Sequence, residues 1–72
     1  MLWAMRTETI RKRVKRAVIM GGLDRPGWQG EMAEAIGMSP ASVSKALTGN
    51  GLGDEACRRI LEAIEAHIHA MA

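Results

Sequence analysis

Apolar residues recur along the chain at the spacing of amphipathic helices. The first apolar stripe consists of Ile10, Val14, Ala17 and Val18. Thr7 is expected to cap this helix with its hydroxyl, Glu8 suits the positive end of the helix dipole, and Gly21-Gly22 stops the helix. Residues 23–27, L-D-R-P-G, have the composition of a turn, and Trp28 is expected to open the next helix.

Two short helices joined by a tight turn are predicted between residues 29 and 49. The apolar positions on their inner faces are Met32, Ala33, Ile36, Val43, Ala46 and Leu47. Gly37 can adopt the positive φ that ends the first helix, and Met38 is expected to tuck the turn inward. Ser39 can cap the second helix, and Pro40 occupies the first helical position, where its missing N–H costs nothing. The pattern therefore predicts a helix-turn-helix.

A longer helix is predicted to follow the glycine-rich connector of residues 48–53, with Asp54 as its cap and Leu52 pinned to the core. Its apolar stripe is formed by Ala56, Ile60, Ile64, His67, Ile68 and Met71, and is widened by Cys57 and Leu61. That stripe spans more than a third of the helix circumference and runs past the needs of a three-helix core. The surplus predicts a homodimer interface through Ile64, Ile68 and Met71.

The segment from Gln29 to Gly49 resembles the helix-turn-helix of phage-type (lambda repressor/Cro-like) regulators. The residues that carry this resemblance are Gln29, Ala33, Gly37, Met38, Val43 and Gly49. Residues 33–49, with the helix that starts at Asp54, are similar to the headpiece of lactose-repressor-type regulators. The two resemblances cover about the last two-thirds of the chain. They imply an all-α, four-helix, lambda-repressor-like DNA-binding domain over residues 7–72, preceded by an N-terminal arm over residues 1–6.

The resemblance, together with the basic residues of the first helix, indicates which residues would contact double-stranded DNA. Base contacts are expected from Pro40, Ala41, Ser44 and Lys45, and phosphate contacts from Lys12, Lys15, Arg16, Gln29, Ser39, Thr48 and Asn50. Gln29 matches the glutamine with which phage-type regulators bind a phosphate at a helix start, where the helix dipole favours an anion. Pro40 and Ala41 stand where relatives often carry long polar side chains, so Lys45 is the one long donor of the second motif helix.

The charge of the chain is unevenly distributed, although the net charge is only +2. Residues 1–30 contain seven Lys or Arg and two Asp or Glu, whereas residues 31–72 contain three and six. Lys12, Lys15 and Arg16 fall opposite the apolar stripe of the first helix, with Arg11 and Arg13 at its flanks. A charged face of this kind is often merely solvated, but beside a helix-turn-helix it favours contact with phosphates.

Composition narrows the class of protein further. Seventy-two residues form one small domain, and a hydrophobic share of 47% without Phe or Tyr indicates an aliphatic helical core. The one cysteine, Cys57, is expected in that core, which fits a reducing cytoplasm. No apolar run approaches the roughly 18 residues of a membrane span, so a soluble cytoplasmic protein is expected. For Met1–Met5, two alternatives remain: a flexible arm or annotation extension, or a segment that Trp3 anchors on the body.

The sequence offers no arrangement typical of an enzyme. The serines at positions 39, 42 and 44 have no histidine nearby in sequence, and so small a domain has little room for a substrate pocket. His67 and His69 are two residues apart, and neither pairs with Cys57 at a metal-ligand spacing. No catalytic residue, metal, cofactor or small-molecule ligand is therefore expected.

These observations predict a sequence-specific transcriptional regulator, a Cro-like repressor that binds a palindromic operator as a homodimer. The alternative is a protein-interaction module, such as an antitoxin or a phage accessory factor, whose helix-turn-helix only autoregulates. The broad apolar stripe of the last helix supports this alternative.

Overall fold

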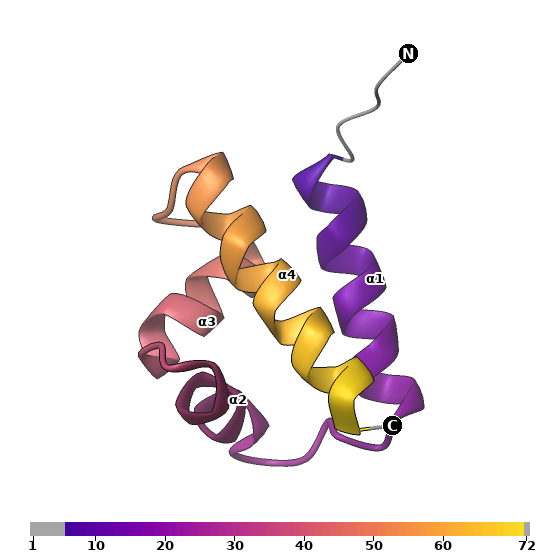
Figure 1. The fold of residues 1–72 in the computed structure, drawn as a ribbon. Coiled ribbons are helices and arrows are strands. Elements are labelled where there is room, and N and C mark those ends of the chain that lie inside the picture. Colours follow the sequence, from indigo (N-terminus) through magenta and orange to yellow (C-terminus); the bar gives the residue numbers. More distant parts are fainter. Residues whose placement is uncertain (1–5, 72) are drawn as a thin grey trace.

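The computed structural model describes residues 6–71, which form four helices and no strand (Figure 1). The helices are α1 (Thr7–Met20), α2 (Trp28–Ile36), α3 (Pro40–Thr48) and α4 (Asp54–Met71). The prediction of an all-α, four-helix domain is confirmed. Of the predicted arm, residues 1–5 lie outside the described residues, as does Ala72 at the other end.

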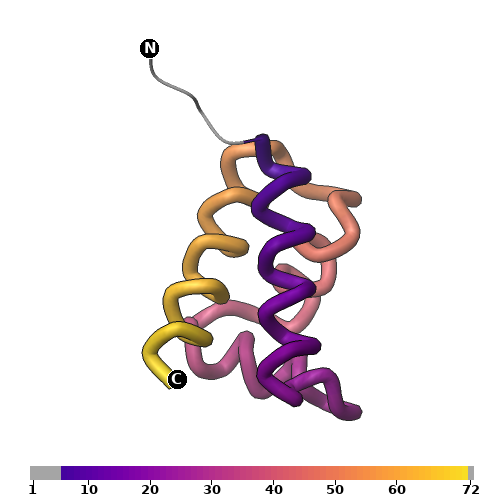
Figure 2. Tube along the Cα trace, turned by 90° about the vertical axis from the view of Figure 1, so that its right-hand side faces the viewer, coloured from indigo at the N-terminus to yellow at the C-terminus, as the bar shows by residue number. Residues whose placement is uncertain are grey.

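Helix α4 occupies the centre of the fold and contacts each of the other three helices. α1 and α4 run side by side in the same direction, and α2 and α3 lie on the other side of α4 (Figure 1). After a quarter turn, α1 stands in front with α4 beside it (Figure 2). The core between them is made of Ile10, Val14, Val18, Met32, Ala33, Val43, Ala46, Leu47, Ile60, Leu61, Ile64 and Ile68.

The central position of α4 corrects the predicted dimer interface. Ile64 is fully buried and Ile68 keeps only 9% exposure within a single chain, so neither side chain is available to a second copy. The stripe looked too wide for a three-helix core, but α4 is covered by three helices and needs a wide apolar surface for them alone. Met71, the third predicted interface residue, is 51% exposed at the end of α4, and Ala56 at its beginning is also exposed.

The turn between α2 and α3 forms largely as its residues predict. Gly37 has φ 73°, and the N–H of Met38 donates to the carbonyl of Ala33 at 2.8 Å, which closes the end of α2. The Oγ of Ser39 accepts from the N–H of Ser42 at 3.2 Å, and Pro40 is the first residue of α3. The expected burial of Met38 under the turn is wrong, because the residue is 41% exposed.

Two predicted helix caps lie one residue inside their helices. Thr7 and Asp54 are the first residues of α1 and α4, and the residues that precede them are Arg6 and Gly53. The carbonyl of Gly53 accepts the N–H of Cys57 at 3.0 Å. Thr7 is 7% exposed, and its Oγ1 has no hydrogen-bond partner among the described residues. A buried hydroxyl without a partner loses its hydration without compensation.

We expect Thr7→Val to raise the free energy of unfolding by about 1 kcal/mol, because the methyl group keeps the shape of the side chain and removes the buried hydroxyl. Urea denaturation followed by circular dichroism measures the change. Thr9→Val is the matched control, because Thr9 lies in the same helix and is exposed. A Thr7→Val variant no more stable than Thr9→Val would show that the hydroxyl has a partner in solution.

Candidate nucleic-acid interface

The outer face of α3 carries the predicted base-contacting residues. α2 is seen nearly end-on while α3 runs across the view, so the two helices cross steeply (Figure 1). Pro40, Ala41 and Lys45 are exposed and Ser44 is half-buried. The opposite face of α3 is buried through Val43, Ala46 and Leu47. The buried side of α3 packs on the core, and its outer face stays accessible.

The hydroxyls at the two ends of α3 hold the backbone of the helix. At the start, the Oγ atoms of Ser39 and Ser42 lie 2.9 Å apart within hydrogen-bonding distance. At the end, Thr48 Oγ1 donates to the carbonyl of Ser44 at 3.1 Å and accepts the N–H of Asn50 at 3.4 Å. Ser39, Thr48 and Asn50 were predicted as phosphate contacts, and all three are exposed. Their first structural role is to fix the ends of α3.

A cavity of about 320 Å³ brings together three predicted phosphate-contacting residues from three helices. Lys15 comes from α1, Gln29 from the first turn of α2 and Thr48 from the end of α3. We call this cavity the three-helix cleft. Its full lining is Lys15, Val18, Ile19, Asp24, Trp28, Gln29, Leu47 and Thr48. The Lys15 ammonium and the Gln29 amide, which lies near the start of α2, are donors suited to an anion, and Asp24 is the one opposing charge in the lining. The Thr48 hydroxyl donates its proton within α3 and borders the cleft.

The other predicted basic contacts lie apart from the three-helix cleft. Lys12 and Arg16 line a separate cavity of about 300 Å³ together with Arg13. Both are exposed, and Lys12 Nζ lies 3.7 Å from the carboxylate of Glu8 one turn earlier in α1. Such an exposed pair is weak and leaves the ammonium accessible. The structure thus divides the basic face of α1 between two neighbouring surfaces.

Two arginines of α1 have structural partners that the sequence did not reveal. Arg13 forms a two-pronged ion pair with Glu65 of α4, with Nη2 donating to Oε1 at 2.7 Å and Nε donating to Oε2. The hydrogen bond with Glu65 raises the pKa of the Arg13 guanidinium above its ordinary value. Arg11 Nε donates to the backbone carbonyl of Ala46 in α3 at 2.9 Å. Both arginines therefore connect α1 to other helices.

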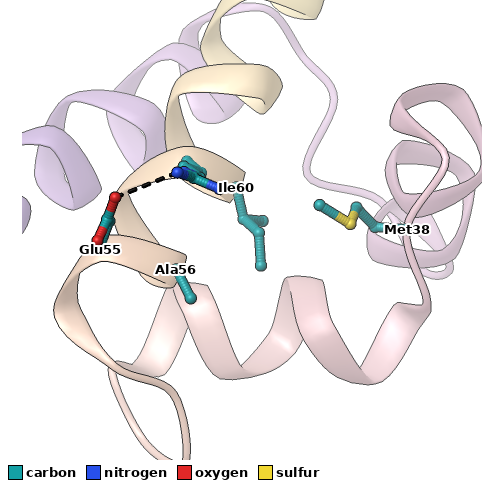
Figure 3. Close-up of a pocket in the computed structure, with 5 residues that line it drawn as sticks. Met38, Glu55, Ala56 and Ile60 are labelled. Carbon is teal, nitrogen blue, oxygen red and sulfur yellow. Dashed lines mark hydrogen bonds and ion pairs between the residues drawn. The ribbon is translucent and has the colours of Figure 1, made fainter.

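A further cavity of about 460 Å³ lies between the α2–α3 turn and α4. Met38 extends from the turn toward Ile60, while Ala56 and the Glu55–Arg59 ion pair lie along α4 (Figure 3). This groove is mainly apolar.

Between residues 6 and 71, no group of three or more His, Cys, Asp or Glu is arranged to hold a metal. None of the helices in that range has the length and hydropathy needed to cross a lipid bilayer.

Comparisons with known proteins found no match: no family model, no curated protein and no solved structure is significantly similar to the chain.

Proposed function

We propose that the protein is a sequence-specific DNA-binding transcriptional regulator, acting in the cytoplasm as a Cro-like repressor. One observation carries the proposal: Lys15, Gln29 and Thr48 converge from three helices on one cleft, and Thr48 also belongs to the outer face of α3. A phosphate in that cleft would be held next to α3, whose exposed outer face could meet base edges. Recognition of duplex DNA uses both kinds of contact, because phosphate contacts position the protein and base contacts read the sequence.

In this proposal α3 enters the major groove. Lys45 can donate to O6 and N7 of a guanine, Ala41 can pack on a thymine methyl, and Ser44 can contact a base or a phosphate. Pro40 adds shape but no donor. Lys12 and Arg16 extend the phosphate contacts along α1, outside the cleft. With one long donor, direct readout is limited, so DNA shape and bending supply the remaining discrimination.

The proposed regulator acts as a homodimer on a palindromic operator. Two-fold symmetry would then place the two recognition helices about 34 Å apart, with half-sites about 10 base pairs from centre to centre. The buried positions of Ile64 and Ile68 require that this contact use other residues. Met71, at the exposed end of α4, is compatible with such a contact.

A protein-interaction module, such as an antitoxin or phage accessory factor, is the second candidate. It is favoured by the exposed apolar residues Ile19 and Met20 at the end of α1, which are 62% and 79% exposed. An obligate heteromer would co-purify with its partner and bind DNA poorly alone. A self-sufficient regulator would be isolated as a homodimer that binds a selected duplex.

Selection from a random duplex pool tests the leading proposal. We expect one palindromic sequence to be enriched, and its affinity to exceed that of random duplex by a ratio toward the low end of about 10³ to 10⁷. Competition titrations at fixed salt measure this ratio. Equal affinity for selected and random duplexes would contradict sequence-specific binding.

Lys45→Ala should weaken binding to the selected duplex by about 1–3 kcal/mol and relax the preference at one base pair per half-site. The reason is the loss of the only long donor on the outer face of α3. Arg59→Ala is the control, because it removes an exposed cation from α4 outside the proposed interface. A preference that survives Lys45→Ala unchanged would show that other residues read the bases.

A further inference from the structure

Arg11 connects α1 to α3, two helices that have few other contacts with each other. Its Nε donates to the carbonyl of Ala46 at 2.9 Å, across 35 residues of sequence. Arg11 is half-buried and Ala46 has no exposed surface, so water competes little for this hydrogen bond. The bond is therefore a direct polar connection between the basic helix α1 and α3, the proposed recognition helix.

The acceptor is one of the last carbonyls of α3, which have no partner within their own helix. The carbonyl of Lys45, one residue earlier, accepts the N–H of Gly49 at 2.7 Å. The N–H of Asn50, which would be the helical partner of the Ala46 carbonyl, donates to Thr48 Oγ1 instead. The Ala46 carbonyl accepts a hydrogen bond from Arg11 in its place. A cation also suits the negative end of a helix dipole. Arg11 thus closes the end of α3 from another helix.

The chain directly after α3 is shaped to admit the guanidinium. Gly49 has φ 81°, a conformation that side-chain-bearing residues rarely adopt. A Cβ at this position would lie 3.0 Å from Arg11 Nη2 and 3.2 Å from its Cζ. The guanidinium therefore packs against the bare glycine backbone while its Nε binds Ala46. The carbonyl of Ala46 and the missing side chain at Gly49 therefore both accommodate Arg11.

We propose that Arg11 is a positioning residue for DNA recognition: it fixes the end of the recognition helix relative to the phosphate-binding side chains. Lys15 lies one helical turn after Arg11 on α1, and Thr48 lies two residues after Ala46 on α3. Both Lys15 and Thr48 line the three-helix cleft. The Arg11–Ala46 hydrogen bond consequently sets how the base-reading face is placed when a phosphate occupies the cleft. This inference rests on the proposed function.

DNA binding distinguishes a positioning role from a direct phosphate contact. In Arg11→Met, affinity for the selected duplex should fall at least about tenfold, while affinity for random duplex and the salt dependence stay unchanged. Loss of a phosphate contact would instead weaken both duplexes and lower the slope of log K against log salt by about 0.9. Arg16→Met is the comparison variant, expected to show that second pattern. Arg11→Lys should recover part of the specific affinity, because its ammonium can donate to the same carbonyl.

Hydrogen exchange without DNA tests the structural half of the inference. In Arg11→Met, the amide of Gly49 should exchange at least about tenfold faster, whereas the amide of Met38 at the end of α2 stays unchanged. If Arg11→Met unfolds the whole chain, Arg11→Lys is measured instead, with a smaller acceleration expected at the same amide. Unchanged exchange at Gly49 would overturn the positioning role. Faster exchange at Gly49 in a protein that prefers no duplex would support the positioning of α3 and refute the proposed DNA recognition.

Discussion

Replacing Ile64 by alanine should lower the free energy of unfolding by about 2–5 kcal/mol. Ile64 has no exposed surface and lies in the helix that all three others cover. Truncating it removes buried methyl groups and leaves a cavity that rigid neighbouring helices cannot fully close. A domain of this size has little stability to spare, so a large fraction of the variant should be unfolded. Urea denaturation followed by circular dichroism measures the loss.

The same experiment separates a core role from the interface role that the sequence indicated. A core substitution costs the same free energy at every protein concentration, whereas an interface substitution removes a concentration-dependent part of the stability. Met71→Ala is the matched control, because Met71 lies on the same helix with 51% exposure and should change stability little. A small loss in Ile64→Ala, or a loss that disappears on dilution, would contradict the core assignment.

The helices were predictable because their apolar spacing is local information. Ser39, Pro40 and Gly37 each act within a few residues, and the structure confirms their roles. The packing partners of an apolar stripe cannot be predicted from this spacing, because they depend on how many helices surround the stripe. The burial of Ile68 follows from neighbours far away in sequence, and no count of apolar positions along α4 reveals them.

The candidate site shows the same division. The sequence identified Lys15, Gln29 and Thr48 by residue type and by resemblance, but could not show that they share one cleft. The partners of Arg11 and Arg13 lie 35 and 52 residues away in sequence, beyond any helical periodicity. Both arginines stood at the flanks of the apolar stripe, the positions from which a side chain can reach a neighbouring helix. That position was the one available signal of their structural roles.

Replacing Lys12, Lys15 and Arg16 together by glutamine should weaken binding to selected and random duplex alike. Each phosphate that a cation neutralises contributes about 0.9 to the slope of log K against log salt, so the slope should fall by up to about 2.7. All three residues are exposed on α1, and Lys15 lies in the three-helix cleft. Titrations over a range of salt concentrations measure the slope for both duplexes.

A second triple variant removes the same amount of charge elsewhere. Its three arginines each pair with a glutamate, and they are Arg25, Arg58 and Arg59. Glutamine at these positions lowers the net charge equally but leaves the basic face of α1 intact, so the salt slope should change little. If both triple variants lose affinity equally, overall charge attracts the DNA and the face of α1 has no special role. If only the α1 variant loses affinity, Lys15→Gln alone should account for about one third of its change in the slope of log K against log salt.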